Sequence, residues 1–168
     1  MRIKFSVFWN KIKPYIIPYL VAISIPMTVG IVAAALTKDS MDIYDTLKSP
    51  PLAPPAILFP IVWTILYVLM GVSSAMVFID RELSPDETRK GFVWYGASLV
   101  LNFSWSIIFF NLQASFFALL VLLALLYTII KTIIEYYKVK PLAAYLQIPY
   151  ALWVAFAGYL NAGIWLLN

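Results

Sequence analysis

The sequence of 168 residues has no cysteine and no histidine. Without cysteine the chain offers neither disulfides nor thiolate chemistry, and it says nothing about redox compartment. Without histidine it lacks the commonest metal ligand and the commonest general base. The sequence also lacks a P-loop, a G-x-G-x-x-G turn and any cluster of metal ligands. No metal site is expected, and most conventional catalytic schemes are excluded.

Charged residues are scarce, at 12% of the chain, whereas hydrophobic residues make up 63% and the mean hydropathy is +0.88. Soluble globular domains have roughly 25% charged and about 45–50% apolar residues. The composition therefore predicts a membrane protein that contacts the lipid bilayer. Because no stretch is polar enough to form a separate soluble domain, we expect a single domain over residues 1–168 and no nucleic-acid partner.

Long charge-free runs set the number of membrane crossings. A helix of about 20 apolar residues crosses the hydrocarbon core of roughly 30 Å. The run 91–130 is charge-free and about twice as long as one crossing requires, so it must turn, and its only polar cluster lies at 111–115. The sequence predicts an all-α membrane protein, a five-transmembrane-helix bundle with spans at about 15–36, 57–79, 91–112, 115–137 and 142–167.

Basic residues fall on alternate connections of these spans. Ten of the twelve lie in segment 1–13, in loop 80–90 or at the end of the fourth span, and only Lys38 and Lys48 lie on the other side. The positive-inside rule then places the amino terminus in the cytoplasm and the carboxyl terminus outside. Segment 1–13 mixes basic and aromatic residues, which is typical of a segment that anchors to the membrane surface. A signal peptide that is cleaved after 33–35 is the alternative for the first span.

The first loop, residues 37–56, is rich in proline. Its prolines fix φ and remove backbone donors, which excludes a regular helix or a central strand over 50–55. We interpret the loop as an ordered lid that folds back onto Trp63 and Tyr67 of the second span. Its large apolar side chains would then be shielded from water, namely Tyr44, Leu47 and Leu52. A proline-rich linker that merely joins two helices is the alternative.

Two further spans each present an aromatic face that includes an amide. On the third span, steps of three and four place on one face Trp94, Ser98, Asn102, Trp105 and Phe109. On the fifth span the corresponding face comprises Tyr150, Trp153, Ala157 and Asn161. Because an amide in hydrocarbon needs a partner, both faces must turn toward other helices or a cavity. With Trp63 and Tyr67 they suit an aromatic cavity for a large, flat, mostly apolar ligand.

The alternative is that these rings and amides serve only helix packing and the interfacial aromatic belt. Gly71 and Ala75 have the small-xxx-small spacing that lets helices approach closely. Apart from Lys131 and Glu135, which are placed to snorkel at the end of the fourth span, no charged residue lies within the spans. A coupled transporter or channel is therefore poorly supported. The sequence pattern is therefore compatible with both a ligand-binding protein and a structural protein.

Four motifs in order along the chain resemble the TspO/MBR family, also called translocator proteins or tryptophan-rich sensory proteins. They are YDTLKSPPLAPP (44–55), FPIVWTILYVLMG (59–71), LNFSWSIIFF (101–110) and PYALWVAFAGYLNAGIWLLN (149–168). The resemblance covers most of the chain after residue 44. It implies a five-helix bundle, often a homodimer, with a pocket closed by the first loop, and it favours a bacterial cytoplasmic membrane.

The resemblance also implies a ligand and a site. Family members bind porphyrins and other tetrapyrroles, and in some cases sterols or synthetic isoquinoline and benzodiazepine ligands, and no further cofactor is required. With the faces described above, the expected ligand-binding residues are Tyr44, Trp63, Tyr67, Asn102, Trp105, Tyr150, Trp153 and Ala157. Trp63 and Trp153 match the pair linked in bacterial members to light- and oxygen-dependent porphyrin breakdown, so whether the chain is an enzyme stays open.

The chain departs from the family pattern at two places. Leu52 stands where the loop usually has a tryptophan, and Ala162 and Leu166 stand where animal members have a cholesterol-recognition pattern. Sterol binding by that motif is therefore not expected. The expected function is porphyrin binding as a sensor, carrier or light-dependent degrader. The alternatives are a structural or assembly protein without a ligand, and a small-solute transporter.

Overall fold

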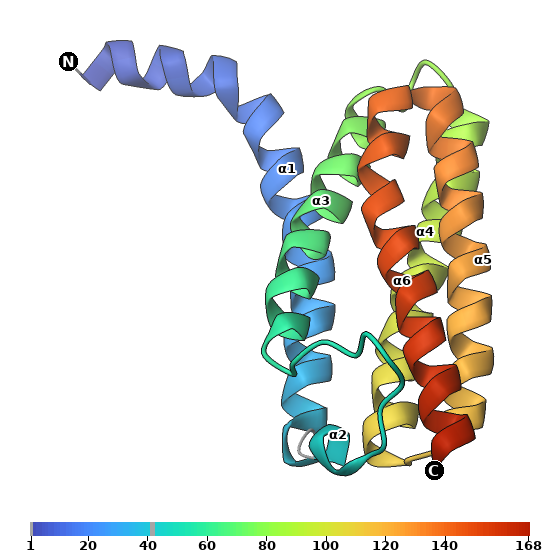
Figure 1. Ribbon diagram of the computed structural model, residues 1–168. Helices are drawn as coiled ribbons and strands as arrows, with labels where there is room; N and C mark the ends of the chain where they lie inside the picture. The colour runs from blue at the N-terminus through green and yellow to red at the C-terminus, as the bar shows by residue number, and fades with distance from the viewer. Residues whose placement is uncertain (1, 41–42) are drawn as a thin grey trace.

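The computed structural model describes the backbone of residues 2–40 and 43–168 and the side chains of residues 16–38, 40, 44 and 46–168 (Figure 1). The side chains of segment 1–13 lie outside this set, so the membrane-surface role of that segment stays a prediction. The elements are α1 (Arg2–Thr37), η1 (Lys38–Ser40), α2 (Ile43–Thr46), α3 (Leu58–Ile79), α4 (Pro85–Ser106), η2 (Ile107–Asn111), α5 (Ser115–Val139) and α6 (Pro141–Leu167).

Five helices are long and apolar enough to cross a membrane. They are α3, α5, α6, the part Ile16–Thr37 of α1, and α4 together with η2 as Pro85–Asn111. The described residues contain no strand. The predicted all-α fold with five transmembrane helices is confirmed, and its helices contact the lipid bilayer.

Proline determines where two of these helices begin. α4 begins at Pro85, because proline has the right φ for a first helical turn and lacks only an N–H that would be unpaired there. Asp86 and Glu87 follow in the same turn and complement the positive end of the helix dipole. The helix thus starts ahead of Gly91, where the charge-free run begins. Pro141 opens α6 in the same way.

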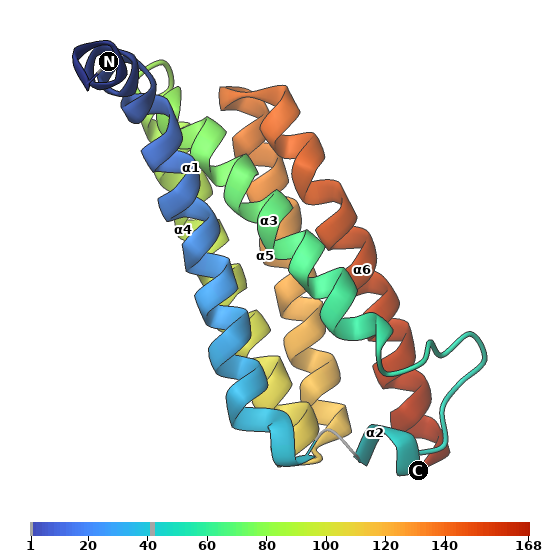
Figure 2. The ribbon, with the colours of Figure 1, turned by 90° about the vertical axis from the view of Figure 1, so that its left-hand side faces the viewer.

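The bundle is arranged so that α1 lies against α3 and α4, α3 against α6, and α5 against both α4 and α6 (Figures 1 and 2). α1 and α3 touch almost backbone to backbone, since a Cβ atom added at Gly71 would lie 2.3 Å from the Cα of Ile23. This contact matches the close approach that the small residues on α3 predicted. The amino-terminal part of α1 bends away from the other helices (Figure 1).

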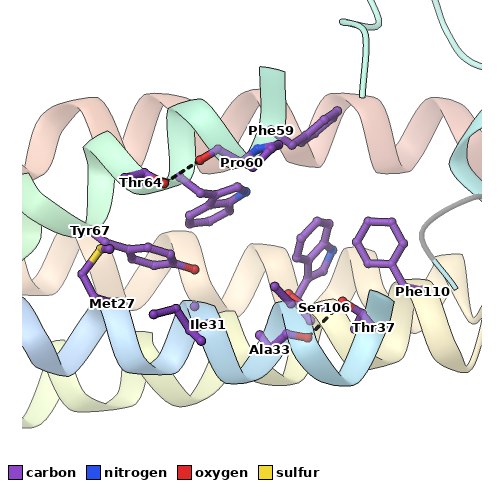
Figure 3. A pocket seen from close by; sticks show the side chains of 14 residues that line it. Met27, Ile31, Ala33, Thr37, Phe59, Pro60, Thr64, Tyr67, Ser106 and Phe110 are labelled. Atoms are coloured by element: carbon purple, nitrogen blue, oxygen red, sulfur yellow. Dashed lines mark hydrogen bonds between the residues drawn. The ribbon is translucent and has the colours of Figure 1, made fainter. Parts of the chain in front are cut away.

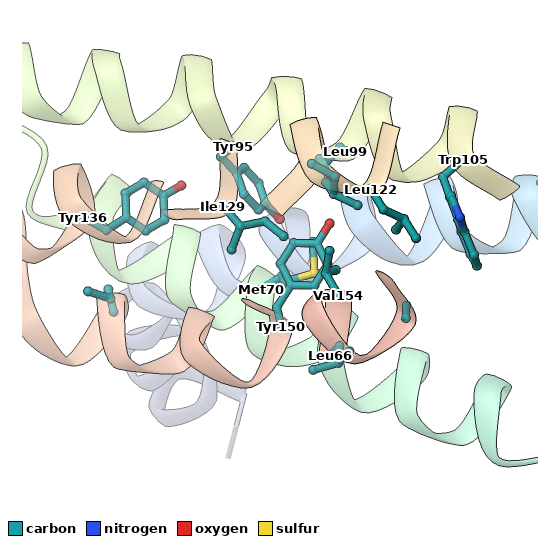
Figure 4. Packing of buried hydrophobic residues seen from close by; sticks show 14 of the residues in the cluster. Leu66, Met70, Tyr95, Leu99, Trp105, Leu122, Ile129, Tyr136, Tyr150 and Val154 are labelled. Atoms are coloured by element: carbon teal, nitrogen blue, oxygen red, sulfur yellow. The ribbon is translucent and has the colours of Figure 1, made fainter. Parts of the chain in front are cut away.

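Apolar side chains occupy both the interior and the outer surface of the bundle. Figure 4 shows Met70, Tyr136 and Tyr150 within the core, and each is at most 1% exposed. On the outside, Val100 and Leu152 are 65% and 66% exposed. Such a surface suits acyl chains rather than water, as expected for helices in a bilayer.

Few polar contacts join the helices. Gln147 Nε2 donates to Ser73 Oγ at 3.2 Å, and that hydroxyl donates to the carbonyl oxygen of Ala143 at 2.7 Å, which ties α6 to α3. At the ends of the same two helices, Lys140 pairs with Asp80 at 2.6 Å. Interhelical hydrogen bonds in membranes contribute about 1 kcal/mol each, so these contacts set helix register more than they set total stability.

Candidate functional site

A cavity of about 210 Å³ lies between α1, α3 and α4, in the half of the bundle near the first loop (Figure 3). α1 contributes mostly small or aliphatic residues to its wall, among them Met27, Gly30 and Ala33. α3 and the end of α4 contribute aromatic rings. Among the residues that the structure describes, none that lines this space is charged, so it suits an apolar guest.

The rings on α3 and α4 give the cavity flat walls. Trp63 and Tyr67 lie one helical turn apart and are stacked, with ring centroids 5.4 Å apart. Tyr150 of α6 packs edge-on against Trp63 from behind, at 6.0 Å. Gly30 of α1 lies directly against the Tyr67 ring, because a Cβ atom there would lie 2.1 Å from it. A planar ligand would meet the faces and edges of these rings.

Among the hydroxyl groups that line the cavity, that of Tyr67 is best placed to donate to a ligand. Thr37, Thr64 and Ser106 also line the cavity, but each donates its hydroxyl proton to a carbonyl of its own helix. Tyr67 Oη instead accepts from Asn102 Nδ2 at 3.2 Å, which leaves its own proton to donate. Figure 3 shows this hydroxyl pointing into the cavity.

A second, smaller chamber of about 20 Å³ continues toward the loop. Tyr44 of the loop and Ala157 of α6 line it. Phe59, Trp105 and Phe110 line both chambers, so these three rings form the partition between them.

The π-helical turn η2 explains why so many rings meet at this partition. Trp105 is the last-but-one residue of α4, and its ring lies 5.5 Å from Phe109 and 6.0 Å from Phe110. In a regular α-helix the residues at i+3 and i+4 share the face of Trp105, whereas the wider π turn also brings the residue at i+5, Phe110, into contact. Such turns are frequent at functional sites.

The first loop caps the smaller chamber. The Tyr44 ring packs edge-on against Phe59 at 5.2 Å, and Phe59 packs against Trp153 of α6 at 5.9 Å. Tyr44 Oη also donates to the carbonyl oxygen of Pro54 at 3.4 Å, which closes the loop on itself.

The carboxyl-terminal end of α6 holds the loop from the other side. The Asn168 amide accepts from the Lys48 N–H and donates to the Lys48 carbonyl, both at 3.0 Å. Tyr159 Oη donates to the Pro51 carbonyl at 2.7 Å. Gly163 lets the loop approach closely, since a Cβ atom there would lie 2.5 Å from the ring of the neighbouring Pro50. The loop is therefore an anchored lid rather than a free linker.

The expectation that Leu52 is shielded from water is wrong. Its side chain is 83% exposed, and its φ of 68° lies in the left-handed region. The N–H of Ala53 donates to the Pro50 carbonyl at 3.3 Å, so Leu52 is the third residue of a tight turn, a position that takes positive φ in type II turns. The turn thus directs the side chain outward.

Five of the eight predicted site residues line one of the two chambers, and the other three do not. Trp63, Tyr67 and Trp105 line the larger cavity, and Tyr44 and Ala157 line the smaller chamber. The other three stand one layer behind the walls and contact lining residues, namely Asn102 behind Tyr67, Tyr150 behind Trp63 and Trp153 behind Phe59.

Some wall residues were not predicted from the sequence. Met27, Gly30 and Ala33 of α1 belong to the larger cavity, as do Phe59 and Phe110. The F-P-x-x-W sequence at the start of α3 and the adjacent pair of phenylalanines after Trp105 were available signals for the two rings. α1 carried no comparable signal. No three His, Cys, Asp or Glu side chains in the described part of the chain come together as metal ligands.

Comparison with known proteins agrees with this architecture. The chain is 35% identical over 154 residues to the tryptophan-rich protein TspO of Chlorobaculum tepidum, covering 91% of this chain and 97% of that protein. It is 35% identical over 128 residues to protein CrtK of Rhodobacter capsulatus, covering 74% and 78%. It is also 37% identical over 122 residues to the human (Homo sapiens) translocator protein, covering 73% and 72%. The TspO/MBR family profile matches residues 22–166, so the chain belongs to the TspO/MBR family.

Proposed function

We propose that this integral membrane protein binds tetrapyrroles such as porphyrins in the aromatic cavity and acts as a sensor, carrier or light-dependent degrader. The observation that carries the proposal is a space bordered by Trp63, Tyr67 and Trp105, in which the lining residues that the structure describes carry no charge. A porphyrin is a flat, mostly apolar π system, for which ring faces and one or two polar contacts are suitable partners. Relatives named translocator protein and tryptophan-rich sensory protein fit the carrier and sensor roles.

A porphyrin needs more room than either chamber offers. Pockets for drug-sized ligands measure roughly 300–1,000 Å³, whereas the chambers measure about 210 Å³ and about 20 Å³. Phe59 is the partition ring nearest the loop and is only partly buried. We infer that it turns aside when the ligand enters, so that the macrocycle reaches from Tyr67 to Ala157. Without histidine, stacking and hydrogen bonds would hold the ring.

Light-dependent breakdown would need no acid, base or metal from the protein. It would need a bound porphyrin that absorbs light, oxygen, and an oxidisable indole beside the ring. Trp63 borders the cavity, whereas Trp153 stands behind Phe59. We therefore expect Trp63→Phe to lower light-driven turnover more than Trp153→Phe.

We place the chain in a bacterial cytoplasmic membrane, with the amino terminus in the cytoplasm and the loop outside, as the distribution of basic residues predicts. Lys38 directly follows Thr37 of the cavity wall. In the proposed orientation it lies on the outer side of the membrane. Its ammonium group would suit the propionate groups of a porphyrin at the outer rim. A homodimer is the assembly that the family resemblance implies.

A titration of the purified protein in detergent with protoporphyrin IX tests the proposal. In the dark we expect saturable quenching of tryptophan fluorescence. Illumination in air should then bleach the bound porphyrin faster than free porphyrin, and Trp63→Phe should slow the bleaching. Absence of saturable quenching would reject porphyrin binding. Saturable binding without accelerated bleaching would reject degradation and keep the sensor and carrier roles. Porphyrin flux into liposomes then separates these two, because only a carrier should produce it.

A further inference from the structure

Asn161 of α6 contacts both sides of the turn between α4 and α5. Its side chain is 1% exposed, and both polar atoms are used. Oδ1 accepts from the indole Nε1–H of Trp105 at 3.2 Å, and Nδ2 donates to the carbonyl of Ser115 at 2.7 Å. Trp105 comes just before η2, and Ser115 is the first residue of α5. One buried amide thus ties together the residues that flank the turn.

The Trp105 indole is part of the partition between the two chambers. Its ring has one polar atom, Nε1, so a hydrogen bond to that atom selects one orientation of the ring plane. Phe109 and Phe110 pack on the same indole, and Phe110 lines both chambers with it. A change in the indole orientation would therefore alter the shape of both chambers.

We propose that Asn161 is a positioning residue, which captures the Trp105 indole N–H and thereby sets the partition that decides which flat ligands fit. The inference rests on the proposed ligand site. Asn161 also lines the smaller chamber, beside Ala157. If Asn161 were only an interhelical tie, its loss would lower stability without changing ligand affinity in a specific way.

The same helix supplies a matched control. Gln147 is also 1% exposed, and its amide donates to Ser73 on α3, away from both chambers. Asn161→Leu and Gln147→Leu each remove a buried interhelical amide from α6. Both should lower the melting temperature, but only Asn161→Leu should change Trp105.

Two measurements distinguish positioning from stability. Ultraviolet resonance Raman spectra report indole hydrogen bonding, and the Trp105 band is assigned by subtracting the spectrum of Trp105→Phe. We expect this band to shift to the unbonded position in Asn161→Leu and to stay in place in Gln147→Leu. Titration with protoporphyrin IX should show a loss of affinity of up to about tenfold for Asn161→Leu alone, the usual effect of one lost hydrogen bond.

A double-mutant cycle completes the test. If Asn161 acts through the indole, Asn161→Leu should have little further effect on affinity in a Trp105→Phe background. An unchanged Trp105 band, equal affinity losses in the two amide variants, or full additivity in the cycle would each overturn the inference. Asn161→Ser is the smaller change if the leucine variant does not fold. If the wild type binds no protoporphyrin, the proposed function fails, and the Raman comparison alone decides whether Asn161 orients Trp105.

Discussion

Tyr67 on α3 and Asn102 on α4 share a hydrogen bond of 3.2 Å at the wall of the larger cavity. Asn102 is 2% exposed, so its amide needs a protein partner within the bilayer, and the Tyr67 hydroxyl provides one. Because the amide donates, the hydroxyl proton of Tyr67 remains for a ligand. The amide therefore gains a partner and orients a hydroxyl group at the wall of a mostly apolar cavity.

Removing this hydroxyl should weaken ligand binding and also lower stability by about 1–3 kcal/mol, because the buried Asn102 amide loses its acceptor. Tyr67→Phe keeps the ring that stacks on Trp63 and deletes the hydroxyl that faces the cavity and accepts from Asn102. We expect the affinity for protoporphyrin IX to fall about threefold to tenfold, as for one hydrogen bond of ~0.5–1.5 kcal/mol. Tyr127→Phe, on the exposed side of α5, is the control. Equal titration curves for all three proteins would show that the hydroxyl does not contact the ligand.

Shortening the partition ring should make porphyrin entry faster. Phe59→Ala removes the ring between Tyr44 and Trp153 and joins the two chambers. Stopped-flow fluorescence should show faster association of protoporphyrin IX, because the ligand no longer has to displace the ring. Phe117→Ala, at an exposed site on α5, should leave the rate unchanged. Slower association in Phe59→Ala than in wild type would contradict the idea that this ring obstructs entry.

Loosening the lid should shorten the lifetime of the complex. Tyr159→Phe and Asn168→Ala each remove hydrogen bonds from α6 to the loop. We expect each to raise the dissociation rate of protoporphyrin IX by about threefold to tenfold, measured by chasing the complex with an excess of a porphyrin acceptor. Tyr145→Phe alters an exposed tyrosine at the opposite end of α6 and serves as the control. Unchanged dissociation in both lid variants would mean that the ligand leaves by another route.

A methyl group at Gly30 should be harmful, whereas the same group at Gly96 should not. The added Cβ atom at Gly30 would lie 2.1 Å from the Tyr67 ring, whereas at Gly96 it meets nothing within 4 Å. Gly30→Ala should therefore lower the melting temperature and weaken porphyrin binding. Gly96→Ala should be neutral or stabilising by up to ~1 kcal/mol, because alanine is the better helix former. Thermal unfolding in detergent checks both, and a fully stable Gly30→Ala would contradict the observed packing of α1 on α3.

The helix count could be predicted from the sequence because charge is excluded from hydrocarbon and the run 91–130 is too long for one crossing. Residues that share a face could also be predicted, since helical spacing depends only on the chain itself. Depth could not. Asn102, Tyr150 and Trp153 lie on the predicted faces, yet they stand behind the cavity wall, because the bulk of Tyr67, Trp63 and Phe59 comes between.

The inner face of α1 and the direction of the Leu52 side chain depend on tertiary structure, which the sequence pattern does not determine. The part Ile16–Thr37 of α1 is apolar and free of charge, so periodicity could not mark the face that carries Gly30 and Ala33. Its inner face is defined only by the partner ring of Tyr67. Leu52 was expected to be buried because it is apolar, but the proline turn that contains it decides its direction, and it points outward.

The most direct test of the account is whether filling the cavity abolishes binding. Ala33 is 6% exposed and lines the cavity, whereas Ala35 lies two residues further along α1 and is exposed. Equilibrium titration with protoporphyrin IX should show binding weakened by about tenfold or more, equivalent to at least ~1.4 kcal/mol, in Ala33→Leu. Ala35→Leu should match the wild type. Saturable binding of the same affinity in Ala33→Leu and Ala35→Leu would contradict the claim that the ligand occupies this cavity.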